Sequence, residues 1–137
     1  MGMATETSRY WWHRYTSAES FQRILDGEDP WIAIGDFLDE WKREDIKDRV
    51  ELVADPIASL VPPAMAQWAA FFSAMVEDLC VRDGLRAPVW TEDKCYILEH
   101  PWFLYPGWRL KVWQLATTPP AFKKRNIFGG DRILERA

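Results

Sequence analysis

Apolar side chains recur at helical spacing along most of this chain. The clearest case starts at Pro30, which suits the first position of a helix, directly after Asp29, a good N-cap. Its apolar residues fall at i, i+3, i+7 and i+10, on one helical face: Trp31, Ile34, Leu38 and Trp41. The polar residues off that face are expected in solvent: Asp36, Asp39, Glu40 and Lys42.

The longest apolar pattern predicts a helix over about residues 64–82, after the break at Pro62 and Pro63. Several alanines raise its helix propensity, and its first half is almost encircled by apolar residues. Its broad apolar face is formed by Met65, Trp68, Phe72, Met75, Val76 and Leu79. We therefore expect this helix to be central and buried.

Shorter helices are expected on both sides of it. One is predicted to follow a Thr or Ser N-cap at residues 16–17 and to run to about residue 25, and one is predicted over 45–54, with a stripe of Ile46, Val50 and Val53. Further short helices are predicted over 91–98, 107–117, 118–125 and 131–136, and no segment shows convincing period-2 alternation. The pattern predicts one all-α domain over residues 1–137, a bundle of five to seven helices around residues 64–82, with residues 1–15 partly disordered.

Composition narrows the class of protein. The chain has 137 residues, 48% apolar and 28% charged, which excludes a disordered protein and a collagen-like fibre. No apolar run approaches the ~18 residues of a membrane span. The unusual figure is the aromatic share of 15%, with nine tryptophans.

The compartment is inferred from the cysteines and the N-terminus. Cys80 and Cys95 have neither CxxC spacing nor a dense framework, so we expect free thiols in a reducing compartment. The first residues lack the basic and apolar regions of a secretory signal. A cytoplasmic location is therefore expected.

Charge is divided unevenly along the chain. Residues 17–60 hold 12 acidic and 5 basic residues, whereas residues 101–137 hold 7 basic and 2 acidic ones. This division allows the two ends to face each other within the fold or in a head-to-tail pair, and it also allows a basic face to meet an acidic partner. The net charge of -4 argues against a dedicated nucleic-acid binder.

No catalytic or metal-binding pattern is visible. Cys80 lies on the apolar helix and is expected in the core, and Cys95 with His100 matches no known signature. The two histidines, His13 and His100, lack HxxxH or HExxH spacing. The sequence therefore predicts no catalytic residue, no metal and no cofactor.

Two kinds of segment remain as candidate binding sites, each with a structural alternative. The basic segment 122–126 favours contact with phosphate or an acidic partner, but cations also suit a solvated helix end. The aromatic clusters at residues 11–13 and 100–103 could stack a flat ligand, but such rings more often fill a core.

Three stretches carry a resemblance to known proteins: residues 34–41, residues 85–90 and the C-terminal run from His100. The last contains PWF at 101–103, TPPAFKKRNIF at 118–128 and LERA at 134–137. It resembles a family of uncharacterised bacterial proteins in which these patterns recur. Some members follow helix-turn-helix regulator domains, and others look like antitoxins of toxin–antitoxin pairs. This chain has no room for a separate helix-turn-helix domain before residue 30, and the family brings no established catalytic residues.

We therefore predict a non-enzymatic interaction module, an antitoxin-like or regulatory partner of another protein such as a toxin or a neighbouring gene product. A homodimer is also compatible with the sequence. The residues expected to bind the partner are Trp102, Trp108, Arg109, Lys123, Lys124 and Arg125. Charge reversal at residues 123–125 is expected to weaken binding without loss of stability. The alternatives are a nucleic-acid-binding regulator that uses the basic C-terminal third and a small-ligand pocket lined by Trp and His100.

Overall fold

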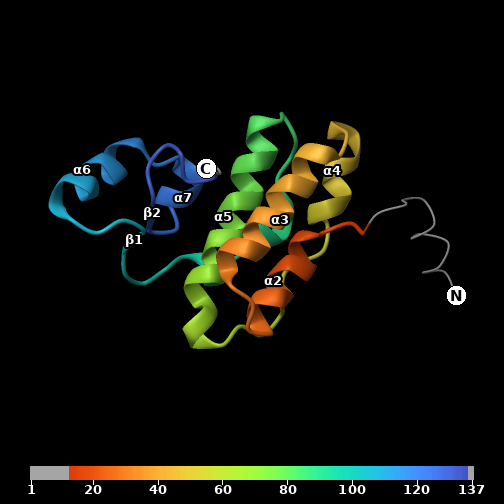
Figure 1. Cartoon of the computed structure of the whole chain (residues 1–137), viewed down its shortest axis with the longest axis horizontal. Helices are drawn as coiled ribbons and strands as arrows, with labels where there is room; N and C mark the ends of the chain where they lie inside the picture. Colours follow the sequence, from red (N-terminus) through yellow and green to blue (C-terminus); the bar gives the residue numbers. More distant parts are fainter. Residues whose placement is uncertain (1–12, 136–137) are drawn as a thin grey trace, which may run out of the picture.

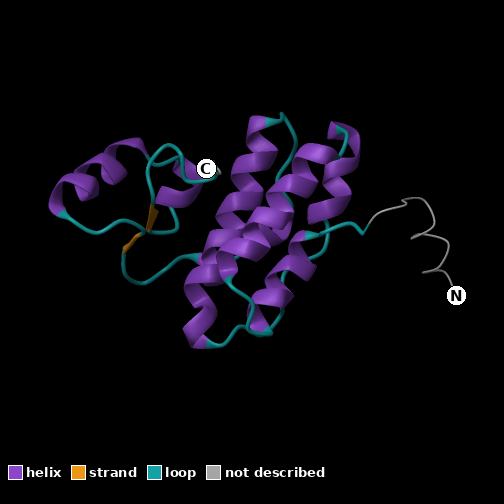
Figure 2. Ribbon diagram, viewed as in Figure 1, coloured by secondary structure: helices purple, strands orange, loops and turns teal. Residues whose placement is uncertain are grey.

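The computed structural model describes residues 13–135 and consists mostly of helices (Figures 1 and 2). The α-helices are α2 (Ser17–Leu25), α3 (Pro30–Arg43), α4 (Ile46–Val53), α5 (Ala66–Arg82), α6 (Trp108–Thr117) and α7 (Pro120–Lys123). Single 3-10 turns cover Pro63–Met65, Val89–Glu92 and Lys94–Tyr96, and two short strands are β1 (Trp102–Phe103) and β2 (Ile127–Phe128). The predicted all-α class is confirmed.

The first helices begin where their capping residues predict. The Thr16 hydroxyl accepts a hydrogen bond from the Glu19 backbone N–H at 3.1 Å, and α2 follows. The Asp29 carboxylate accepts from the Trp31 backbone N–H at 2.9 Å, with Pro30 in the first helical position. Each contact satisfies a backbone donor that the first turn of a helix leaves without a partner.

Helix α5 is the centre of the molecule, as its apolar pattern predicts. Phe71, Phe72 and Met75 have no exposed surface, and Phe72 contacts the rings of Phe21 from α2 and Phe37 from α3. Such aromatic pairs add to the free energy that burial of apolar surface provides. The helical bundle of α2, α3, α4 and α5 is built around this contact (Figure 1).

Helix α4 does not bury the stripe that its sequence predicts. Leu52 and Val53 are in the core, but Ile46 and Val50 are 53% and 47% exposed. The helix has only eight residues and packs against α2 along one edge, where the Ser17 hydroxyl donates to the Leu52 carbonyl at 3.3 Å. The prediction for Ile46 and Val50 is therefore wrong: this edge contact turns them toward solvent.

Glu40 is a second correction, because it is fully buried and not in solvent. Its carboxylate accepts hydrogen bonds from the Tyr15 backbone N–H and the Arg43 guanidinium. The neighbouring Glu44 is also buried, and Arg14 donates to both of its oxygens, at 2.6 and 3.1 Å. Burial raises the pKa of Glu44 and the nearby Glu40 adds to this, whereas Arg14 opposes it. These contacts hold residues 14 and 15 in place. The prediction of disorder for residues 1–12 falls outside the described residues.

Two short predicted helices are absent from the described residues. Residues 91–98 form parts of two 3-10 turns, because the Thr91 hydroxyl donates to the Pro88 carbonyl and the Asp93 carboxylate accepts from the Cys95 N–H. These local bonds compete with helix formation. Residues 131–134 form a turn only.

Two short strands join segments of the C-terminal part that are far apart in the sequence. Strands β1 and β2 pair in parallel, with Trp102 opposite Ile127 and Phe103 opposite Phe128. Two-residue strands are too short to show alternation, which is why the sequence does not reveal them. Helices α6 and α7 lie between the strands in the chain, and Figure 1 shows α6 at one end of the molecule. None of the described helices combines the length and the hydropathy that a bilayer crossing requires.

Candidate functional site

Helix α6 turns a polar residue inward. Gln114 is its one buried residue, with no exposed surface. The Gln114 amide nitrogen donates to the carbonyls of Tyr105 and Leu110, both at 3.0 Å, and its oxygen accepts from the Tyr105 N–H at 3.1 Å. The side chain therefore fastens α6 to the preceding loop through hydrogen bonds, beside the contact between the Trp113 and Tyr105 rings.

The outer face of α6 carries an apolar stripe. Its residues lie at i, i+4 and i+7, and their exposed fractions are 76%, 48% and 47%: Trp108, Val112 and Leu115. Full burial of each such side chain would contribute about 1.5–3 kcal/mol. An exposed apolar stripe on an otherwise folded protein is the usual sign of a contact surface.

A second contact holds α6 against the end of the chain. The Trp113 ring lies over Gly130, so closely that a Cβ atom built on this glycine would be 2.1 Å from Trp113 Cη2. The Thr118 hydroxyl accepts from the backbone N–H groups of Gly129 and Gly130, at 3.1 and 2.8 Å. Only a glycine fits this position, which also has a positive φ of 83°.

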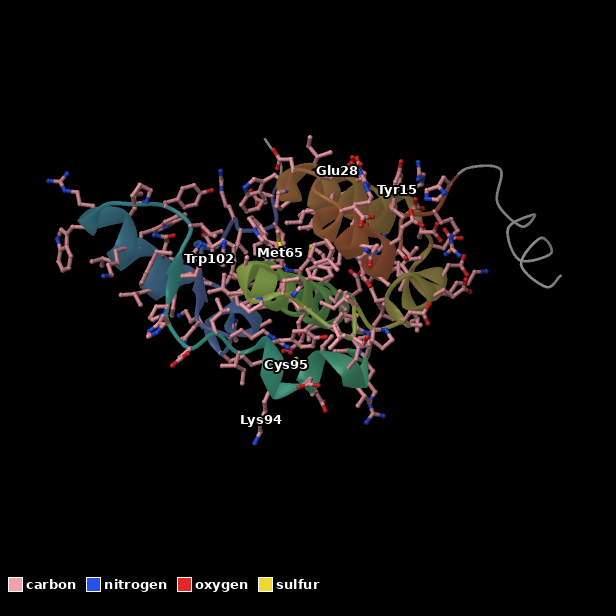
Figure 3. The ribbon with its side chains drawn as sticks, turned by 90° about the horizontal axis from the view of Figure 1, so that it is seen from below. Tyr15, Glu28, Met65, Lys94, Cys95 and Trp102 are labelled. Atoms are coloured by element: carbon pink, nitrogen blue, oxygen red, sulfur yellow. The ribbon has the colours of Figure 1, made fainter. Side chains whose placement is uncertain are left out.

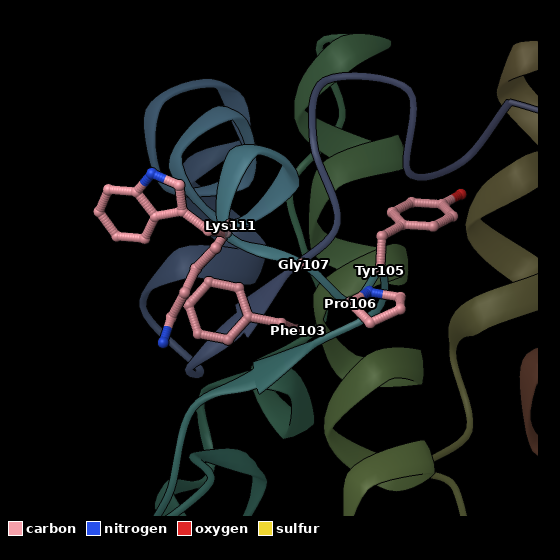
Figure 4. A pocket seen from close by; sticks show the side chains of 6 residues that line it. Phe103, Tyr105, Pro106, Gly107 and Lys111 are labelled. Atoms are coloured by element: carbon pink, nitrogen blue, oxygen red, sulfur yellow. The ribbon is translucent and has the colours of Figure 1, made fainter.

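A shallow hollow of about 470 Å³ lies beside this stripe, lined by Phe103, Tyr105, Pro106, Gly107, Trp108 and Lys111. The Phe103 ring stacks on Phe128 at 4.9 Å between centroids, and the Lys111 ammonium lies 5.0 Å from the Phe103 centroid. Figure 4 shows the Lys111 side chain beside the Phe103 ring, with Tyr105 directed away from both. The hollow thus joins aromatic surface to a cation.

Every Lys, Arg, Asp or Glu residue in the surrounding sequence is basic. Residues 100–130 contain five Lys and Arg residues and no Asp or Glu. Arg109 and Lys111 are both exposed on α6, next to the apolar stripe. We refer to Trp108, Arg109, Lys111, Val112 and Leu115 together as the α6 face.

The predicted partner-binding residues divide between this face and other places. Trp108 and Arg109 are on the α6 face, whereas Trp102 is half-buried in β1. Lys123 is half-buried, with its ammonium 3.4 Å from the Ala116 carbonyl. Lys124 is exposed and forms an ion pair with Glu77 on α5 at 2.7 Å.

Arg125 is buried, with 2% of its surface exposed. Its guanidinium donates to the carbonyls of Ala121 and Thr91, both at 2.7 Å, and to the Glu77 carboxylate at 2.8 Å. The charge therefore faces the bundle. This burial changes the expected effect of charge reversal at residues 123–125, because reversal at Arg125 would lower stability.

The ionisation of Glu77 is expected to make the stability of the protein depend on pH. Burial opposes ionisation of its carboxyl group, but hydrogen bonds from Lys124 and Arg125 outweigh it and hold the pKa below the ordinary 4.5. The ionised carboxylate thus stabilises the fold at neutral pH, and this contribution is lost as the pH falls through the lowered pKa. We expect Glu77→Gln to be less stable than the wild type at pH 7 and to lose less stability on acidification. Urea denaturation across the acidic range measures both, and an equal loss in the two proteins would contradict the assignment.

Trp102 belongs to a row of tryptophans that sequence reasoning did not group. Trp31 from α3 contacts Trp68 from α5 at 5.2 Å between centroids, and Trp68 contacts Trp102 at 5.1 Å. Phe71 lies beneath all three rings. Figure 3 places Trp102 between the bundle and α6. The row joins the two parts of the molecule, and Trp31 is the most exposed of the three, with 49% of its surface exposed.

The remaining candidates lie in separate places. His100 and Trp102 line an open hollow of about 420 Å³, and Cys95 lines another of about 500 Å³.

The two cysteine thiols are protonated at neutral pH. Burial and the adjacent Asp93 raise the pKa of the Cys95 thiol, and burial raises the pKa of the Cys80 thiol to about 11. Both thiols are free, as expected.

The other aromatic cluster predicted from the sequence, residues 11–13, is described only in part. His13 is exposed beside Glu19, and Trp11 and Trp12 lie outside the described residues. Within residues 13–135 no three His, Cys, Asp or Glu side chains gather in a way that could hold a metal ion.

Comparisons with protein-family models, with curated proteins and with solved structures found no match to this chain.

Proposed function

We propose that this protein is an interaction module that docks another protein chain on the α6 face. The observation that carries the proposal is the side of α6 that faces the protein. This side buries the polar Gln114 and leaves the apolar Trp108, Val112 and Leu115 in solvent. Large aromatic residues in exposed positions are the ones that most often dominate binding energy. The antitoxin-like or regulatory role implied by the C-terminal motifs is the form of this function that we favour.

The partner's contact surface is apolar and acidic. Arg109 and Lys111 flank the stripe, and residues 100–130 contain five basic residues and no acid, which favours an acidic partner surface. Two other cations of the segment, Lys124 and Arg125, are bound by Glu77. This pairing, together with the net charge of -4, favours a protein over a nucleic acid as the partner.

Trp108→Ala is expected to abolish partner capture without loss of stability. The side chain is 76% exposed, so its removal creates no cavity. The measurement is affinity purification of tagged protein from the cells that express it, with Leu60→Ala as the control. Leu60 is equally apolar and even more exposed, but lies on the loop before α5.

The two variants distinguish binding at the α6 face from non-specific binding to exposed apolar residues. A protein retained by the wild type and by Leu60→Ala but lost with Trp108→Ala supports the proposal. Capture that survives Trp108→Ala contradicts it. Binding lost on nuclease treatment would support the nucleic-acid alternative instead.

A further inference from the structure

A second apolar stripe faces solvent on α4. Ile46, Val50 and Ala54 lie at i, i+4 and i+8 and are all exposed, while Leu52 and Val53 hold the helix to the bundle. The spacing places the three on one side of the helix. We refer to them as the α4 face.

The surroundings of the α4 face are mainly acidic, opposite in sign to the basic residues of the α6 face. The exposed charged residues between 45 and 56 are three acids and one base, Asp45, Glu51, Asp55 and Lys47. Of these, Glu51 is also ion-paired with Arg14 at 3.1 Å. The whole stretch 17–60 has 12 acidic against 5 basic residues, whereas residues 100–130 contain five basic residues and no acid. Opposite potentials on two apolar surfaces favour their association and disfavour pairing of either surface with itself.

The two faces cannot meet within one chain. Helix α4 lies at one end of the long axis of the molecule and α6 at the other (Figure 1). Their stripes are similar in length, since residues 46–54 span roughly 12 Å and residues 108–115 roughly 10 Å at 1.5 Å per residue. One face can therefore cover the other only if they belong to different molecules.

We propose that a second copy of this chain is a partner of the α6 face, which docks on the α4 face of that copy. The inference rests on the proposed function, in which the α6 face is a docking surface. The contact is head to tail, so a pair leaves one α4 face uncovered on one copy and one α6 face uncovered on the other. Such a contact extends into a chain of molecules or closes into a ring.

Two variants test the contact from both sides. Trp108→Asp removes the α6 face and Ile46→Asp removes the α4 face, each by placing a charge in an exposed stripe. We expect the wild type to gain mass progressively with concentration in analytical ultracentrifugation, and each variant alone to sediment as one chain of 16.1 kDa. An equimolar mixture of the two is expected to form a species of two chains and nothing larger, because only one intact contact remains. Leu60→Asp is the matched control and should associate like the wild type.

Each other outcome overturns the inference. If the wild type remains monomeric at about 1 mM, self-association is excluded. Loss of association with Trp108→Asp but not with Ile46→Asp indicates pairing of two α6 faces, and a mixture that does not associate excludes the head-to-tail contact. These failures are distinguishable from that of the proposed function, which is tested by capture of a different protein and survives if Trp108→Ala still abolishes that capture.

Discussion

Arg125→Ala is expected to lower the free energy of unfolding by about 3 kcal/mol or more. The guanidinium is almost completely buried and donates to two carbonyl groups and to the Glu77 carboxylate. Its removal would leave the Thr91 and Ala121 carbonyls without these donors, and a half-buried carboxylate with only Lys124. Removal of one partner of a buried ion pair is costly because the other charge stays in a poorly solvated place. Equilibrium unfolding in urea measures the loss.

Lys124→Ala is the matched control for this prediction. Lys124 contacts the same Glu77 oxygen, but its side chain is 55% exposed. An exposed ion pair contributes only about 0–1 kcal/mol, so the two neighbouring substitutions should differ by severalfold. Equal effects would mean that the burial of Arg125 has no energetic consequence and would contradict the role we assign to it.

Gly130→Ala is expected to destabilise the attachment of α6 by about 3 kcal/mol. Part of the cost is strain, because an L-residue rarely adopts the φ of 83° found here. The larger part is the overlap of the new methyl group with the Trp113 ring, which must move away from Gly130. Hydrogen exchange of the α6 amides should therefore accelerate more than that of α5, which is buried by other contacts.

Gly84→Ala separates the two costs. Gly84 also has a positive φ, of 70°, but a Cβ atom there would meet nothing within 4 Å. We expect only the strain, about 1 kcal/mol, and no preferential loosening of α6. If Gly130→Ala costs no more than Gly84→Ala, the Trp113 contact does not hold the helix.

Much of the bundle could be predicted from local signals. The caps at Thr16 and Asp29 place the starts of α2 and α3, and the apolar run of residues 64–82 correctly indicates the central helix. These signals are sufficient because capping and a nearly all-apolar helix depend little on what packs against them. The start of α6 after Gly107 is likewise confirmed.

The residues that the sequence misplaces depend on tertiary contacts. Arg125 stands in a basic run typical of a surface, but it lies in the turn after α7, where its guanidinium donates to the carbonyl of the buried Ala121. Glu40 faces inward because Arg43 and the Tyr15 backbone bind it. Helix α4 shows the converse case, because an apolar stripe indicates a contact but not whether the contact lies inside one molecule.

For the α6 face itself, the sequence identifies Trp108 and Arg109 but not their arrangement. The helix is predicted, whereas its orientation is set by Gln114 and by the Trp113 contact with Gly130. A buried glutamine among apolar neighbours is opposite to what amphipathic patterning predicts. The sequence alone therefore does not reveal which side of α6 is exposed.

The attachment of α6 through Gln114 and Trp113 separates two kinds of evolutionary constraint. The fold depends on the inward side of this helix, so mutations there are removed by selection for a folded chain. The outward side adds nothing to the core, and changes at residues 108, 112 and 115 cost little in folding. Recognition can thus diverge among descendants of this protein while the scaffold is preserved.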